Sequence, residues 1–126
     1  FGEHEESTRF FNTNINRYIN HQPIQLVKDR KMDFIYAGDL YKIIKYYLDG
    51  NDAPKDLNCV YKRKYMLSDI AEIINRLGPY KVDIQSEGQF SVFPYIGKAN
   101  DLPIEYDGLV NGIRKVYEKY LCQRDV

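Results

Sequence analysis

The sequence predicts a single mixed α/β domain in which helices and short strands alternate along the chain. Apolar residues recur at three- and four-residue spacing in four segments, which is typical of amphipathic helices. Shorter apolar runs bounded by turn residues fall between these segments and indicate strands. The chain of 126 residues, 44% of them hydrophobic, fits one small helix–strand domain spanning residues 1–126, with a core of its own.

The first helix is expected from Ser7 or Thr8, either of which can cap it, to about Asn20. Its apolar stripe at three- and four-residue spacing consists of Phe11, Ile15, Tyr18 and Ile19. Pro23 follows the end of this helix, and the apolar run Ile24–Val27 then predicts a strand.

The central part predicts a strand–turn–helix unit. Residues 28–31 form a charged turn, and residues 33–36 are typical of a short buried strand. Gly38 supplies a tight turn, and Asp39 can cap a helix that runs from Asp39 to Leu48. The turn-forming residues 49–52 end this helix.

The rest of the chain predicts two further helices. One is capped by Ser68, runs to about Leu77 and stops at Gly78-Pro79, and the last covers residues 107–121. Strands are also expected at residues 57–61, 82–84 and 89–93, and a turn at residues 86–88 separates the last two.

Composition excludes several kinds of partner. The 18 basic and 18 acidic side chains cancel, which disfavours nucleic acid and anionic membranes as partners. Apolar runs fall far short of the ~20 residues of a membrane span, so we expect a cytoplasmic protein. Cys59 and Cys122 match no metal spacing, and Cys59, in an apolar run, is expected to be a reduced, buried thiol. The 12 tyrosines suit interfaces and sugar sites, but a tyrosine-rich rim of the core is the favoured interpretation.

Several segments match the motifs of one family in their order and spacing. Asp33-Phe34-Ile35-Tyr36 and Asp39-Leu40 match the pattern Arg-Asp-Phe-Ile-Tyr-Val-x-Asp-Leu, with Met32 at the arginine position. Phe1-Gly2 looks like the end of a Phe/Tyr-Gly-Pro segment, and residues 109–120 look like a closing Gly-Leu-x-x-Gly-Ile-x-x-x-Tyr helix. Together they resemble the second half of the extended short-chain dehydrogenase/reductase family, the NAD(P)-dependent epimerases, dehydratases and reductases of nucleotide sugars.

The resemblance implies the C-terminal, substrate-binding part of such an enzyme without its Rossmann half. NAD(P) is then the cofactor of the full-length parent, whereas this chain alone is expected to hold no cofactor and to be inactive. The eight glycines never form the Gly-x-Gly-x-x-Gly turn that cradles a pyrophosphate. Tyr41 and Lys45 have the spacing of the family's Tyr-x-x-x-Lys relay, but we interpret them as a coincidence because they lie downstream of its expected place.

A cluster of basic residues is the candidate for binding a diphosphate, because guanidinium forks pair well with phosphate oxygens. The cluster consists of Arg9, Lys28, Arg30 and Lys31. A solvated surface patch is an equal alternative. Asn14 and Tyr95 are further candidates for contacts to the substrate, although Asn12, Asn14 and Asn16 cannot all face one ligand on a helix.

A stand-alone binding or interaction module without an enzymatic parent is the alternative function.

The acidic segment Glu3-His4-Glu5-Glu6 lacks a second histidine at helical spacing, so no metal site is expected there. Strands that would join a missing sheet leave unpaired edges and apolar surface. The expected partners are therefore a nucleotide sugar together with either a second copy of the chain or the missing Rossmann half.

Overall fold

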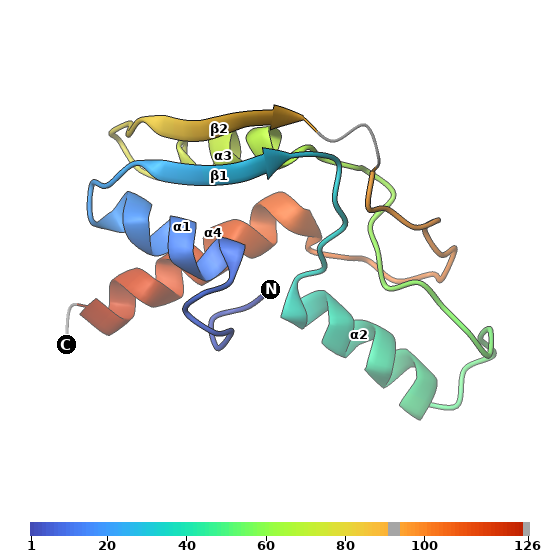
Figure 1. Ribbon diagram of the computed structural model, residues 1–126. Helices are drawn as coiled ribbons and strands as arrows, with labels where there is room; N and C mark the ends of the chain where they lie inside the picture. The colour runs from blue at the N-terminus through green and yellow to red at the C-terminus, as the bar shows by residue number, and fades with distance from the viewer. Residues whose placement is uncertain (91–93, 125–126) are drawn as a thin grey trace.

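The mixed α/β architecture predicted from the sequence is present in the computed structural model, which describes residues 1–90 and 94–124 (Figure 1). The elements in chain order are α1 (Phe10–Ile19), β1 (Ile24–Asp29), α2 (Ala37–Leu48), α3 (Leu67–Ile74), β2 (Ile84–Phe90) and α4 (Gly108–Arg124).

The two strands pair in parallel, with Ile24 opposite Ile84. A parallel pair needs a long crossover, and here the crossover contains α2 and α3. After the pair Leu26–Ser86 the next partners are Lys28 and Gln89, so β2 contains one extra residue. The extra residue shifts the register of the pairing between Leu26 and Lys28.

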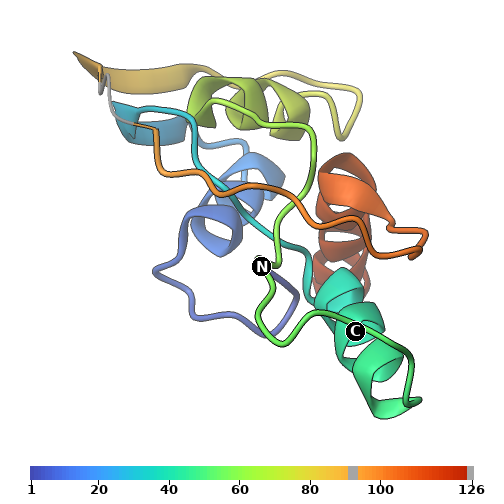
Figure 2. The same ribbon diagram turned by 90° about the vertical axis from the view of Figure 1, so that its right-hand side faces the viewer.

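Two helices, α1 and α3, pack against the sheet, α4 packs against α1, and α2 stands apart. α1 packs against β1, α3 and α4. Figure 1 shows α2 projecting from the opposite end of the molecule to the free end of α4, and in Figure 2 α2 lies at the lower right, away from the two strands. The core lies between α1, α3, α4 and the buried face of β1, and its largest fully buried apolar side chains are Tyr18, Phe11, Ile15, Ile24, Ile70, Ile74, Ile113 and Val116.

Tyrosines contribute to this core through their rings and their hydroxyls. Tyr18 is fully buried, and its ring stacks on Tyr80 at 4.5 Å between centroids. Its hydroxyl donates to the Tyr80 carbonyl and accepts from the Gly78 N–H, both at 2.8 Å. A Cβ at Gly78 would lie only 2.8 Å from that hydroxyl oxygen. The packing of Tyr18 therefore also requires glycine at position 78.

Two buried asparagines bind the backbone near the start of each strand. The Asn14 amide donates to the Gln25 carbonyl at 3.2 Å and accepts from the Gln25 N–H at 2.9 Å. Asn75 makes the same pair of bonds with the Val82 backbone, at 2.9 and 2.8 Å. Each amide forms the two hydrogen bonds that a neighbouring strand would form with one residue. The N–H and the carbonyl of that residue are therefore both paired.

Two expected strands are wrong. Residues 33–36 are extended but form no ladder with another described segment, and the Tyr36 N–H donates to the Tyr61 hydroxyl instead. Isolated bridges join Lys31 to Met66 and Met32 to Tyr95 just before them. Residues 57–61 are also irregular, because their polar groups pair with side chains rather than with a strand.

The strands expected at residues 82–84 and 89–93 are instead one strand, β2, which continues through the expected turn at 86–88 because that segment pairs with β1. Residues 91–93 lie outside the described part of the chain. Helix starts differ as well. α1 begins after Arg9 rather than at Ser7 or Thr8, and α3 begins after Met66 rather than at Ser68.

We predict that Asn14→Ala lowers the free energy of unfolding by about 2 kcal/mol, because it removes both side-chain hydrogen bonds to the Gln25 backbone at a buried position. Urea unfolding followed by circular dichroism measures this loss. Asn111→Ala is the matched control, since its exposed amide makes one bond to a backbone carbonyl. Equal, small effects in both variants would contradict the role assigned to Asn14.

Candidate functional site

The basic residues after β1 lie at the carboxyl end of the parallel sheet. Both strand arrows point the same way, and Lys28, Arg30 and Lys31 are at the end of β1 or follow it (Figure 1). Ligands of open α/β sheets bind outside the carboxyl ends of the strands. The topology therefore places this cluster at the edge where a ligand is expected.

Asp29 belongs to the same run of charges but faces inward. It is 9% exposed, and its carboxylate accepts the Ser68 N–H at 3.1 Å at the start of α3. The Arg30 carbonyl accepts the Leu67 N–H at 3.0 Å beside it. A carboxylate at a helix N-terminus satisfies unpaired N–H groups and the positive end of the helix dipole. The negatively charged carboxylate of Asp29 thus caps α3.

The cations on either side of Asp29 have no such partner. Lys28, Arg30 and Lys31 form no ion pair with any carboxylate in residues 1–90 or 94–124. The Lys64 ammonium, by contrast, lies 2.7 Å from Asp33. The charge of the cluster is therefore available to an anion.

Arg30 and Tyr95 lie together although they are far apart in the sequence. The Arg30 guanidinium carbon is 5.8 Å from the centre of the Tyr95 ring, within cation–π range. The Tyr95 N–H donates to the Lys31 carbonyl at 2.8 Å, and the Asp33 N–H donates to the Tyr95 carbonyl at 2.9 Å. The structure thus brings Arg30, Lys31 and Tyr95 together.

Two hollows flank the extended segment that carries Arg30. Side chains alternate in an extended chain, so Met32 and Phe34 border one hollow and Asp33 borders the other. The first, about 330 Å³, is lined by Phe1, Glu5, Arg9, Phe10, Phe11, Met32, Phe34 and Leu67. The second, about 640 Å³, is lined by Asp33, Leu57, Asn58, Cys59, Val60, Pro94, Tyr95, Ile96 and Gly97.

The remaining candidates are Arg9, Lys28 and Asn14. Arg9 is mostly exposed, with its guanidinium 4.0 Å from Glu6, and Lys28 is exposed on β1. Asn14 is 2% exposed, and both ends of its amide are bonded to the Gln25 backbone. The ligand-binding roles of all six candidates stay predictions.

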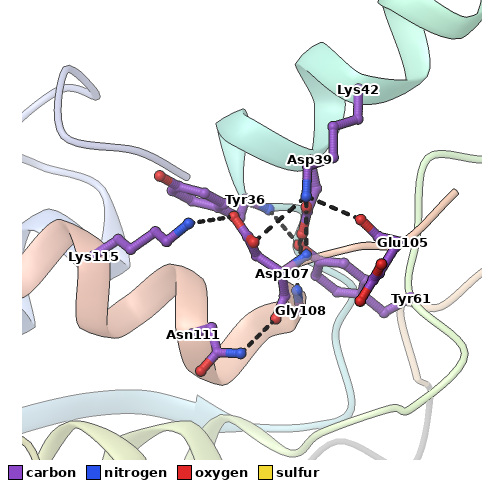
Figure 3. A network of polar contacts seen from close by, with 9 residues as sticks. All are labelled: Tyr36, Asp39, Lys42, Tyr61, Glu105, Asp107, Gly108, Asn111 and Lys115. Atoms are coloured by element: carbon purple, nitrogen blue, oxygen red, sulfur yellow. Dashed lines mark hydrogen bonds and ion pairs between the residues drawn. The ribbon is translucent and has the colours of Figure 1, made fainter.

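A second polar network joins α2 to α4 around a fully buried carboxylate (Figure 3). Asp39 accepts the Asp107 N–H at 2.8 Å, the Gly108 N–H at 3.0 Å and the Tyr61 hydroxyl. We expected Asp39 to cap its own helix, but α2 begins at Ala37, and the carboxylate caps α4 instead. This correction follows from position, because the third residue of a helix lies inside its first turn.

The surrounding charges stabilise this network. The Lys42 ammonium lies 3.5 Å from Asp39 and 3.4 Å from Asp107, and it donates to the Glu105 carbonyl at 3.0 Å. Lys115 binds the second oxygen of Asp107 at 2.8 Å. The Lys115 hydrogen bond and the nearby Lys42 hold the pKa of Asp107 below its usual value.

Tyr61 is held neutral in this network. Burial and the hydrogen bond to Asp39 raise its pKa, and its hydroxyl also accepts the Tyr36 N–H at 3.1 Å. A tyrosine that acts as a general base needs a lowered pKa, so this arrangement suits a structural role. Tyr61 and Asp107 were not predicted from the sequence. Both are far from Asp39 along the chain, so no local pattern indicates that they contact it.

Tyr41 and Lys45 are not arranged as a proton relay. The Lys45 ammonium lies 2.9 Å from Asp49, which raises the pKa of the lysine, and Tyr41 is 63% exposed. Both therefore lie on the open surface of α2, away from the two hollows described above.

Comparison with known proteins supports the fold. No protein-family model and no curated protein matches the sequence. The crystal structure of UDP-glucuronic acid 4-epimerase from Bacillus cereus in complex with NAD is similar at a TM-score of 0.70, with 14% identity over 98% of this chain and 42% of that chain. This chain thus spans less than half of that protein, and the similarity confirms the expected fold class.

Two features are absent from residues 1–90 and 94–124. None of the helices is long and apolar enough to cross a membrane. No three His, Cys, Asp or Glu side chains of this part of the chain gather in an arrangement that could hold a metal ion.

We predict that Asp39→Asn lowers the free energy of unfolding by about 2–3 kcal/mol, because an amide cannot replace a buried carboxylate that accepts three hydrogen bonds. Urea unfolding measures the change. Asp49→Asn, which removes one side of an exposed ion pair, should cost less than about 0.5 kcal/mol. A similar cost for the two variants would contradict the cross-helix cap.

We also predict a loss of stability at alkaline pH. The pKa of Tyr61 is raised above its ordinary value of 10.0 in the folded chain. The contribution of the protonated Tyr61 hydroxyl to the free energy of unfolding is therefore complete below pH 10 and is lost as the pH rises further. The slope is up to about 1.4 kcal/mol per pH unit from this group.

Unfolding titrations between pH 8 and pH 11 should therefore show a shallower alkaline slope for Tyr61→Phe than for the parent chain. Tyr41→Phe, at an exposed position, should leave the slope unchanged. An unchanged slope in Tyr61→Phe would show that its hydroxyl is not the group responsible.

Proposed function

We propose that this chain is the substrate-binding portion of an NAD(P)-dependent epimerase, dehydratase or reductase of nucleotide sugars. The observation that carries the proposal is the cluster of Arg30 and Lys31 beside Tyr95, at the carboxyl end of the sheet and without carboxylate partners among the described residues. The fold similarity to a part of UDP-glucuronic acid 4-epimerase supports it.

The cluster has the chemistry to bind a diphosphate. A guanidinium presents two parallel N–H donors to phosphate oxygens, and a lysine adds a mobile point charge. Arg30 is positioned from both sides, by its backbone bond to the start of α3 and by the ring of Tyr95. This preorganisation reduces the entropy lost when an anion binds.

The adjoining hollow of about 640 Å³ has the size and lining for the ring at one end of such a ligand. Ligand pockets are typically 300–1,000 Å³, mostly apolar and supplied with a few polar groups. Here Leu57, Val60 and Ile96 supply apolar surface, and Asn58 contributes polar groups. The Tyr95 ring at its border offers a face for a base or a sugar.

In this proposal the chain alone does not transfer hydride. The cofactor belongs to the part of the parent enzyme that corresponds to a Rossmann half, and no glycine-rich pyrophosphate turn occurs in this sequence. The residues described here bind and orient the nucleotide sugar so that its reacting carbon faces the other half.

Calorimetric titration tests the proposal with UDP-glucuronic acid, UDP and NAD as separate probes. We expect UDP-glucuronic acid and UDP to bind and NAD not to bind. Arg30→Ala should weaken UDP binding at least about tenfold, which is about 1.4 kcal/mol. Lys81→Ala is the matched control, because this exposed lysine precedes β2 and so lies at the opposite end of the sheet.

Each outcome bears on the proposal. Binding of UDP that Arg30→Ala weakens and Lys81→Ala leaves unchanged supports it. Equal loss in both variants would indicate unspecific charge attraction. Failure of both UDP and UDP-glucuronic acid to bind would favour a stand-alone interaction module instead.

A further inference from the structure

Asp33 borders the hollow of about 640 Å³, but its carboxylate binds groups of the chain itself. One oxygen lies 2.7 Å from the Lys64 ammonium, and the other accepts the Gly97 N–H. The side chains of Asp33 and Lys64 are only 13% and 17% exposed. Removing one partner of a largely buried ion pair is costly, because the other charge is left without compensation. Both oxygens of Asp33 are therefore engaged within the chain.

Asp33 holds Tyr95 through its backbone and Gly97 through its side chain. The Asp33 N–H donates to the Tyr95 carbonyl at 2.9 Å, and the Tyr95 N–H donates to the Lys31 carbonyl at 2.8 Å. These bonds belong to an isolated bridge, so regular strand pairing stops at Tyr95. The Asp33 carboxylate supplies the next contact along this segment. The wall of the hollow that carries Tyr95 is thus fixed at two points by one residue.

Gly97 lies where the two walls of the hollow meet. The opposite wall consists of residues 57–60. A Cβ at Gly97 would lie 3.3 Å from the amide nitrogen of Asn58, so the two walls are in close contact there. The Asn58 amide also donates to the Lys98 carbonyl at 3.2 Å, and the Asn100 amide donates to the Asn58 carbonyl at 3.0 Å. The position of Gly97 therefore determines the width of the hollow.

We propose that Asp33 is a positioning residue that gives this site its preference for a nucleotide over a bare diphosphate. This role rests on the proposed function and adds a determinant of specificity to it. Arg30 and Lys31 supply the charge that attracts the phosphates, and this charge acts equally on both ligands. Only a ligand that carries a base uses the hollow beside Tyr95, whose width depends on the Asp33 carboxylate.

Lys64 makes this position compatible with anion binding. An unpaired carboxylate beside a diphosphate site would repel the ligand, because like charges weaken binding at short range. The Lys64 ammonium compensates the charge of Asp33 at 2.7 Å. The positive charge of Arg30 and Lys31 therefore stays available to phosphates.

Replacement of Asp33 distinguishes positioning from a simple effect of charge. By charge alone, Asp33→Ala removes a negative group and frees Lys64, so UDP and pyrophosphate would both bind more tightly. By positioning, the wall at Gly97 loses its anchor, and a bound base has to order it again. Ordering side chains on binding lowers affinity, so we expect UDP to bind about fivefold more weakly or worse. Pyrophosphate should bind at least as tightly as it does to the parent chain.

Calorimetric titration of UDP and of pyrophosphate into each variant measures this difference. Asp33→Asn keeps an acceptor for the Gly97 N–H and loses the ion pair, so its loss of UDP affinity should be smaller than that of Asp33→Ala. Asp101→Ala is the matched control, because the side chain of Asp101 is 91% exposed and lies 3.8 Å from Lys62. It should leave both affinities unchanged. Circular dichroism establishes that each variant is folded, and Asp33→Asn carries the test if Asp33→Ala unfolds.

Hydrogen exchange of the unliganded chain supplies a second readout. Protection of the Tyr95 amide should fall in Asp33→Ala and stay constant in Asp101→Ala, because only the first variant releases this wall. Unchanged protection of Tyr95 in Asp33→Ala would overturn the positioning role.

The titrations separate this role from the proposed function. Weaker binding of UDP with undiminished binding of pyrophosphate supports the role of Asp33. Equal weakening of both ligands, or tighter binding of both, would overturn it. UDP binding that Arg30→Ala weakens and Asp33→Ala does not would overturn it while leaving the proposed function intact. Failure of UDP to bind the parent chain would overturn the proposed function and the role of Asp33 together.

Discussion

Two buried aspartates, Asp29 and Asp39, hold this fold together by capping helices that do not contain them. Asp29 ends β1 and binds the start of α3, and Asp39 lies in α2 and binds the start of α4. A buried carboxylate is costly unless it is fully hydrogen-bonded. Because each carboxylate is satisfied only where two separate segments meet, these contacts fix α3 against the end of β1 and α2 against the start of α4.

The position of Asp29 also determines the character of the candidate site. Its carboxylate is directed to the N–H of Ser68, so it does not neutralise the basic residues on either side of it. Arg30 is fixed at the same place by its backbone and rests beside Tyr95. One structural contact thus leaves a preorganised positive charge next to a hollow, which is the arrangement that anion recognition requires.

Local patterns in the sequence were enough for the helices and for β1, because an amphipathic stripe such as that of α1 is a local signal. They were not enough for residues 33–36 and 57–61, whose strand-like composition finds no partner strand among the described residues. The turn expected at residues 86–88 became strand, because pairing with β1 outweighed local propensity. Arg30, Lys31 and Tyr95 were identified from residue chemistry, whereas their proximity depends on long-range pairing that no local pattern contains.

The central claim is that the capped crossover presents Arg30 and Tyr95 as a site for a nucleotide diphosphate. A crystal structure of the chain grown with UDP-glucuronic acid tests this claim most directly. The account predicts diphosphate oxygens within hydrogen-bonding distance of the Arg30 guanidinium and a ring in the hollow beside Tyr95. Density for the ligand at another place, with Arg30 and Tyr95 untouched, would contradict it.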